Sequence, residues 1–211
     1  MQRTDLLIIS WLLASAATLQ ATDPLPVLTV PVRVHLMQSV TQARMNTTLT
    51  DTDVQRIFGK VNKVWSQAGI HFDPEPLLKT TALEVSANEK LKNEFERLKA
   101  SLPPASHSSK AINVCYVKML EPNGFYFAGD VFVKDTASLK KVAGGLDEPI
   151  PRVTAHELGH ALGLKHRQNV TNLMASGTTG FSLNEEEIKT ARNAAAMLLQ
   201  PKMGAKSVSV P

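Results

Sequence analysis

The chain has 211 residues, of which 43% are hydrophobic, and a formal net charge of +4 at pH 7, so we expect one domain with a sizeable core. Lysines and arginines are mixed with acidic residues, and no basic run is interleaved with aromatic residues, which speaks against nucleic-acid binding. Cys115 is the only cysteine, which excludes an internal disulfide and a metal site built mainly from thiolates.

Residues 1–21 have the pattern of a secretory signal peptide. A short polar start with Arg3 precedes an apolar run over residues 6–14, and small residues follow up to Ala21. We expect cleavage between Ala16 and Ala21, a folded domain over residues 22–200 and a flexible tail over residues 201–211. The apolar run is much shorter than the roughly 20 residues that span a bilayer. We therefore predict an exported protein, secreted or periplasmic, without stable membrane insertion.

The N-terminal part of the domain predicts a strand, a long helix and a second strand. Residues 28–36 alternate between apolar and polar side chains, as in a half-buried strand. Pro31 cannot donate a ladder hydrogen bond, so this strand lies at a sheet edge or turns that position outward. Polar caps at Thr50 and Asp51 open an amphipathic helix that ends near Gly69, and residues 70–72 form the second strand.

The rest of the chain predicts further strands and helices. Residues 88–99 favour a shorter helix, which a loop rich in proline and serine follows. Residues 112–120 are apolar on both faces, as in a central strand, and residues 124–135 supply one or two more strands. A glycine-containing loop leads to a helix with Pro149 and Pro151 in its first turn. The last helix has a Ser182 cap and glutamates in its first turn.

The stretch HELGHALGLKH carries the chemistry. His156 and His160 are four residues apart, so on a helix their imidazoles project from one face and can bind one ion. Glu157 lies beside the first ligand, close enough to act on a metal-bound water. Gly163 can take the left-handed conformation that ends a helix, and this reversal brings His166 back toward the ion. Three neutral imidazoles and a water predict tetrahedral zinc with one exchangeable position, as in catalytic sites.

This stretch is similar to the extended zinc motif H-E-x-x-H-x-x-G-x-x-H of the metzincin metallopeptidases at all five specified positions. Met174 follows in NLMASG, which resembles the Met-turn that runs beneath the metal in that clan. The order of elements from about residue 27 to residue 199 also resembles a metzincin catalytic domain of matrixin or reprolysin type. Arg167 and Ser176 stand where the subfamilies typically carry other residues, so the sequence assigns no subfamily.

The resemblance implies both a fold and a mechanism. The implied fold is α/β (α+β): a twisted mixed sheet with one antiparallel edge strand, a long backing helix, an active-site helix and a C-terminal helix. The implied function is an exported zinc endopeptidase, in which Glu157 is the general base toward zinc-activated water and Gly163 and Met174 support the site. A peptide or protein substrate would lie extended along a sheet edge, for which the strand starting at Gly124 is our candidate. The implied zinc ligands are His156, His160 and His166.

A non-cleaving zinc-binding or inhibitory module with the same fold is the alternative. Glu157 argues against it, because a module that does not cleave has no chemical need for a base there. His35, His71 and His107 show no ligand spacing, so we expect surface or local hydrogen-bonding roles for them. Cys115 lies in an apolar strand and is expected to be a core thiol rather than a thiolate that blocks the zinc. We expect a monomer.

Overall fold

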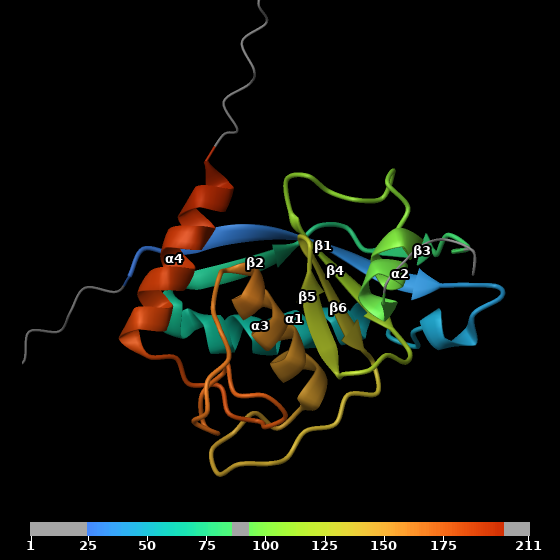
Figure 1. The fold of residues 1–211 in the computed structure, drawn as a ribbon. Coiled ribbons are helices and arrows are strands. Elements are labelled where there is room, and N and C mark those ends of the chain that lie inside the picture. The colour runs from blue at the N-terminus through green and yellow to red at the C-terminus, as the bar shows by residue number, and fades with distance from the viewer. Residues whose placement is uncertain (1–24, 86–92, 201–211) are drawn as a thin grey trace, which may run out of the picture.

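The computed structural model of the chain describes residues 25–85 and 93–200 (Figure 1). The predicted signal peptide, the predicted tail and the start of the predicted helix over residues 88–99 lie outside the described residues. The elements in chain order are β1 (Leu28–Gln38), η1 (Ala43–Met45), α1 (Asp51–Trp65), η2 (Ser66–Ala68), β2 (Ile70–Pro74), β3 (Leu78–Thr81), α2 (Glu94–Ser101), β4 (Ile112–Val117), β5 (Gly124–Phe127), β6 (Asp130–Lys134), α3 (Pro149–Ala161) and α4 (Glu185–Leu199).

The strands form one mixed sheet in the order β2-β1-β4-β6-β5, and β3 also pairs with β1. Every pair is parallel except β5 with β6, which is antiparallel and leaves β5 at an edge. This confirms the predicted fold class and its single antiparallel edge strand. The sequence pattern does not predict the short strand β3.

The first strand is not at a sheet edge, so that alternative for Pro31 is wrong. β1 lies between β4 on one side and β2 and β3 on the other. The N–H of Leu28 and the carbonyl of Val32 both bond toward β2, since they pair with Gly69 and the N–H of Glu75. The backbone groups of the alternate residues of β1, including Pro31, therefore face β4. Pairing with β4 begins only at Val32. The missing donor of Pro31 thus lies before the first paired residue of β4, where the ladder has no hydrogen bond to lose.

Helices α1, α3 and α4 share one hydrophobic core against one face of the sheet, which contributes Val32, Val114 and Val131 to it. The opposite face carries a smaller core around Cys115, against which Leu98 of α2 packs. Figure 1 shows α4 at one end of the sheet and α2 at the other. Within the described segments, no helix combines the length and the apolar character that crossing a membrane requires.

Capping residues set the starts of the helices. Thr50 caps α1, as the sequence predicts. The predicted Ser182 cap of α4 is wrong, because Asn184 is the N-cap and forms a capping box with Glu187. The hydroxyl group of Ser182 instead donates to the carbonyl of Thr171 at 2.8 Å. The helix therefore begins two residues later than the sequence suggests.

Candidate metal centre

Helix α3 carries the first two histidines of the motif. Pro149 begins this helix at a position where a missing N–H leaves no hydrogen bond unmade. One turn separates His156 from His160, and their ring centroids lie 4.8 Å apart. Helical spacing alone therefore brings two imidazoles together.

Gly163 turns the chain so that the third histidine returns to the first two. Its φ is 82°, in the left-handed region that favours glycine, and the N–H of Leu164 donates to the carbonyl of Gly159 at 2.9 Å. Nε2 of His166 then lies 3.1 Å from Nε2 of His160. One ring nitrogen from each of the three motif histidines lies within 4.8 Å of the others.

The ring hydrogen bonds fit a metal site. Nδ1 of His156 lies 2.7 Å from the carbonyl of Leu173, and Nδ1 of His160 lies 2.8 Å from the carbonyl of Leu164. Because a carbonyl only accepts, both Nδ1 atoms carry the proton and Nε2 is left as a free ligand atom. Burial lowers the pKa of His156 to about 3 and also lowers the pKa of His160, so both rings are neutral near pH 7.

The spacing of these nitrogens also fits zinc. Tetrahedral zinc with Zn–N bonds near 2.0–2.1 Å places its nitrogen ligands about 3.3 Å apart. The separation of 3.1 Å between Nε2 of His160 and Nε2 of His166 agrees with that spacing. Neutral imidazoles are the form in which histidine binds a metal. The donor set therefore suits a divalent ion that prefers nitrogen ligands.

Glu157 is buried beside the first histidine, with 5% of its surface exposed. The backbone N–H of Tyr126 on β5 hydrogen-bonds its carboxylate. Burial raises the pKa of Glu157 to about 8, although Arg152 and the Tyr126 N–H both act to lower it. A divalent cation at the three histidines would favour the charged carboxylate and lower this pKa. The proton affinity of Glu157 is therefore coupled to the metal site.

Met174 is fully buried and packs against α3. A Cβ on Gly159 would come within 2.6 Å of Sδ of Met174, so any other residue there would force the methionine side chain to shift. The side-chain oxygen of Asn172 accepts from the N–H of Met174 at 2.6 Å, and the Met174 carbonyl accepts from the N–H of Arg167 at 2.9 Å. The turn therefore contacts both the helix of the first two histidines and the residue after the third.

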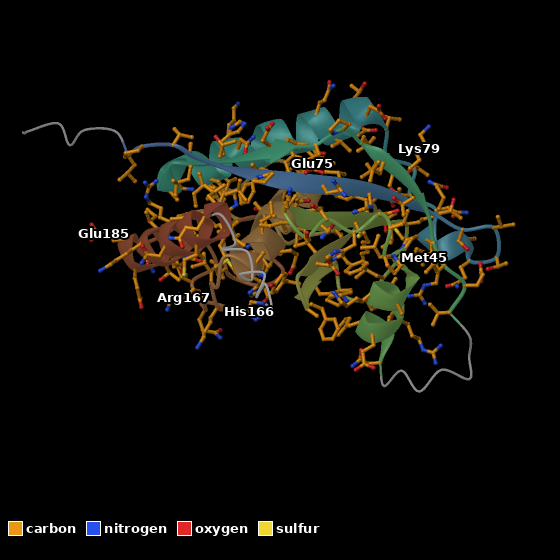
Figure 2. The ribbon with its side chains drawn as sticks, turned by 90° about the horizontal axis from the view of Figure 1, so that it is seen from above. Met45, Glu75, Lys79, His166, Arg167 and Glu185 are labelled. Atoms are coloured by element: carbon orange, nitrogen blue, oxygen red, sulfur yellow. The ribbon has the colours of Figure 1, made fainter. Side chains whose placement is uncertain are left out.

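A buried carboxylate fixes the chain beyond His166, and sequence reasoning missed it. Glu187 of α4, 2% exposed, accepts from Nε of Arg167 and from the side-chain amide of Asn172, both at 2.8 Å. Burial raises the pKa of Glu187, but the hydrogen bonds from Asn184, Asn172 and Arg167 outweigh it and hold the pKa below its usual value. Figure 2 shows His166 and Arg167 next to each other. This ion pair links α4 to the third histidine.

The three histidines and Glu157 line one cavity of about 610 Å³, which β5, α3 and the turn after Met174 enclose. Two residues of its wall have no signal in the sequence pattern. Gly124 lies where β5 meets α3, since a Cβ there would come within 2.6 Å of Val153 and 3.1 Å of Glu157. Arg152 also lines the cavity, although it is 1% exposed. Contacts between separate elements place both residues in the cavity wall, so the local sequence does not reveal their positions.

The other histidines of the described segments lie apart from this centre. His35 is buried and hydrogen-bonded within the sheet, His107 bonds to Asp130 at 2.8 Å, and His71 is exposed on β2. Within residues 25–85 and 93–200, only the motif histidines come close enough together to hold one ion. Cys115 is fully buried in β4, and burial raises the pKa of its thiol well above the usual value, which fits the predicted core role.

The family described as matrixin matches residues 35–194. No curated protein sequence matches the chain. Mirolysin in complex with compound 9 has a TM-score of 0.55 and 12% identity, covering 80% of this chain and 91% of that chain. Mature mirolysin of Tannerella forsythia in complex with a cleaved peptide has a TM-score of 0.55 and 12% identity, covering 84% of this chain and 100% of that chain.

Proposed function

The chain belongs to the matrixin family of metallopeptidases, in agreement with its metzincin motif, and from this premise we propose that it is an exported zinc-dependent endopeptidase. The observation that carries the proposal is the convergence of three imidazoles beside a buried carboxyl group, all on the wall of one cavity. In this proposal the zinc ligands are His156, His160 and His166.

Zinc bound there would lower the pKa of a water molecule toward neutrality and polarise the carbonyl of the scissile bond. Two backbone carbonyls set the tautomers of the proposed zinc ligands. The carbonyls of Leu173 and Leu164 hold His156 and His160 in the tautomer that presents Nε2, and they make that nitrogen more basic. Neither ring has to lose a proton before it binds.

Glu157 would transfer the proton. Its carboxylate accepts a proton from the attacking water and delivers it to the nitrogen of the leaving amine. The N–H of Tyr126 orients the carboxylate, and burial keeps bulk water from competing for it. Glutamine at residue 157 would keep the shape of this group and remove its ability to carry the proton.

The edge strand β5 would bind the substrate backbone. The N–H of Lys134 donates to the carbonyl of Asn123, so odd-numbered residues of β5 bond to β6. The backbone groups of Gly124 and the carbonyl of Tyr126 turn away from β6, while the N–H of Tyr126 faces Glu157. An extended peptide can add to such an edge through main-chain hydrogen bonds. The likeness in fold to a mirolysin structure in complex with a cleaved peptide supports a peptide as the ligand of this chain.

The test is cleavage of an unfolded protein by the mature chain loaded with one equivalent of zinc, with Glu157→Gln as the matched control. We expect fragments from the native protein only, and mass spectrometry of the new termini would give the preferred cleavage sites. Zinc content and thermal melting of both proteins would show that they are folded and loaded.

Each result separates the candidates. If neither protein cleaves any of a range of unfolded substrates while zinc is bound, the non-cleaving module would be favoured. Equal cleavage by both proteins would identify a contaminating peptidase or a different base. Cleavage by the native protein alone would establish Glu157 as essential.

Export of this peptidase rests on residues 1–21 alone. We infer that a signal peptidase removes them, and that the mature chain begins between residue 17 and residue 22. N-terminal sequencing of the protein recovered outside the cytoplasm would check this, and retention of Met1 on that protein would contradict it. Size-exclusion chromatography of the same sample would test the expected monomer.

A further inference from the structure

Arg152 is a buried guanidinium group one helical turn before His156. Backbone carbonyls hold two of its three nitrogens. Nε donates to Gly180 at 2.9 Å, and Nη2 donates to Ala175 at 2.5 Å and to Asn172 at 3.4 Å. These acceptors are uncharged, and among the described residues the Glu157 carboxylate acts on Arg152 through space without a direct hydrogen bond.

The third nitrogen, Nη1, is left without an acceptor. It lies 3.2 Å from Nδ1 of His156, but that Nδ1 carries a proton because it bonds to the carbonyl of Leu173. Two donors therefore face each other, and Nη1 has no other hydrogen-bond partner in the described part of the chain. Burial lowers the pKa of Arg152 to about 10, so the group is still charged near pH 7.

A buried cation without a hydrogen-bonded counter-charge is energetically unfavourable, and an anion that reaches it is correspondingly stabilised. Arg152 lines the same cavity as the three histidines, and the wall next to it is formed by small residues, Ser176 and Gly177. Glu157 is the one acidic residue that lines this cavity, and Tyr126 already bonds it. The cavity therefore has a positive group with a donor that lacks an acceptor, and room for a side chain.

We propose that Arg152 makes this cavity selective for an acidic substrate side chain, Asp or Glu, whose carboxylate accepts hydrogen bonds from Nη1. This specificity rests on the proposed peptidase function and names the class of residue beside the scissile bond. A glutamine side chain has nearly the same shape as glutamate, but its oxygen lacks the charge. A lysine side chain is repelled by the guanidinium group.

A peptide panel tests this selectivity on the native zinc-loaded protein. The panel varies one position beside the cleavage site, which is first mapped on an unfolded protein, and places Glu, Gln, Leu or Lys there. A charge-assisted hydrogen bond is worth roughly 1.5–3 kcal/mol, so kcat/KM for Glu is expected to exceed that for Gln by roughly tenfold or more. Lys is expected to be the poorest substrate.

Variants separate selectivity from folding. Arg152→Gln should reduce the Glu-to-Gln ratio to about one, whereas a purely structural role would lower kcat/KM for all peptides by the same factor. Arg192→Gln is the matched control, because Arg192 also donates to backbone carbonyls, those of Ala68 and Gly69, but lines no part of this cavity. It should leave the ratio unchanged.

The possible failures are distinguishable. Cleavage of the Leu or Gln peptide as fast as the Glu peptide would overturn the selectivity and leave the peptidase proposal intact. An unchanged ratio in a folded, zinc-loaded Arg152→Gln protein would assign the selectivity to another group. Absence of cleavage of every peptide and of unfolded protein, at full zinc occupancy, would overturn both proposals.

Discussion

Sδ of Met174 occupies the space that a side chain on Gly159 would fill, since a Cβ at residue 159 would lie 2.6 Å from Sδ and 3.2 Å from Cε. The helix that carries the first two histidines can therefore rest directly on the buried methionine. This contact explains why a helix-disfavouring glycine lies between the first two histidines of the motif.

Gly159→Ala should destabilise the fold, because Met174 must move in a fully packed region. Overpacking of this kind costs roughly 1–3 kcal/mol, measurable by urea unfolding. Gly59→Ala is the control, because Gly59 lies in α1 and a Cβ there would meet no other atom within 4 Å. That change should stabilise the helix by about 0.5–1 kcal/mol. Equal effects of the two substitutions would contradict the packing role of Gly159.

Gly163→Ala should weaken zinc binding, although a Cβ at this position would cause no steric clash. No atom lies within 4 Å of a Cβ at this position, so the substitution acts through the φ of 82° alone. The left-handed conformation costs a residue with a side chain roughly 1–2 kcal/mol. Relief of this strain would shift His166 away from the other ligands. Competition with a zinc chelator measures the change, and Gly163→Asn should lose less affinity, because asparagine tolerates this conformation.

Zinc should stabilise the native protein and not a variant that lacks a ligand. At a free zinc concentration of 100 times Kd, binding contributes about 2.7 kcal/mol, which raises the melting temperature. His166→Ala should lose most of this increase, and chelation should abolish it in the native protein. His71→Ala removes an exposed histidine of β2 and should keep the full increase. If the His166→Ala protein gained as much from zinc as the native one, the ligand assignment would be wrong.

Glu187→Gln should be less stable than the native protein at neutral pH, and the difference should shrink in acid. The folded-state pKa of Glu187 lies below its ordinary value of 4.5. As pH falls from 4.5 through that lower pKa, the unfolded chain binds more protons than the folded one, so the stability from the ionised carboxylate is lost. Urea unfolding near pH 7 and near pH 3 measures both proteins. A difference that does not change with pH would show that Glu187 is not ionised in the fold.

Local rules predict a large part of this molecule from its sequence. Four-residue spacing places His156 and His160 on one helical face, and the absence of a Cβ lets Gly163 reverse the chain. Alternation and apolar runs likewise indicate the strands, including the central β4 and the edge strand β5. These features depend on residues a few positions apart, where backbone geometry alone fixes their relation.

Errors arise where two local signals compete or where distant segments decide. Ser182 and Asn184 are both good helix caps, and only the reach of Asn184 to the N–H of Glu187 selects between them. Pro31 favours an edge strand, yet β1 is central. The sheet tolerates the proline because its position lies before the first paired residue of β4. Neither the N-cap of α4 nor the place of β1 in the sheet can be predicted without knowing which segments pack next to them.

The sequence by itself determined the three histidines, the glutamate between them and the class of chemistry, because their spacing is set by one helix and one turn. Only the tertiary structure decided the surroundings of that group. Arg152 looks like a surface residue of a helix until the carbonyls after Met174 enclose it. Glu187 looks like one more glutamate of a helix start until Arg167 pairs with it. Burial and partners far along the chain give these charges their roles, and no local pattern encodes them.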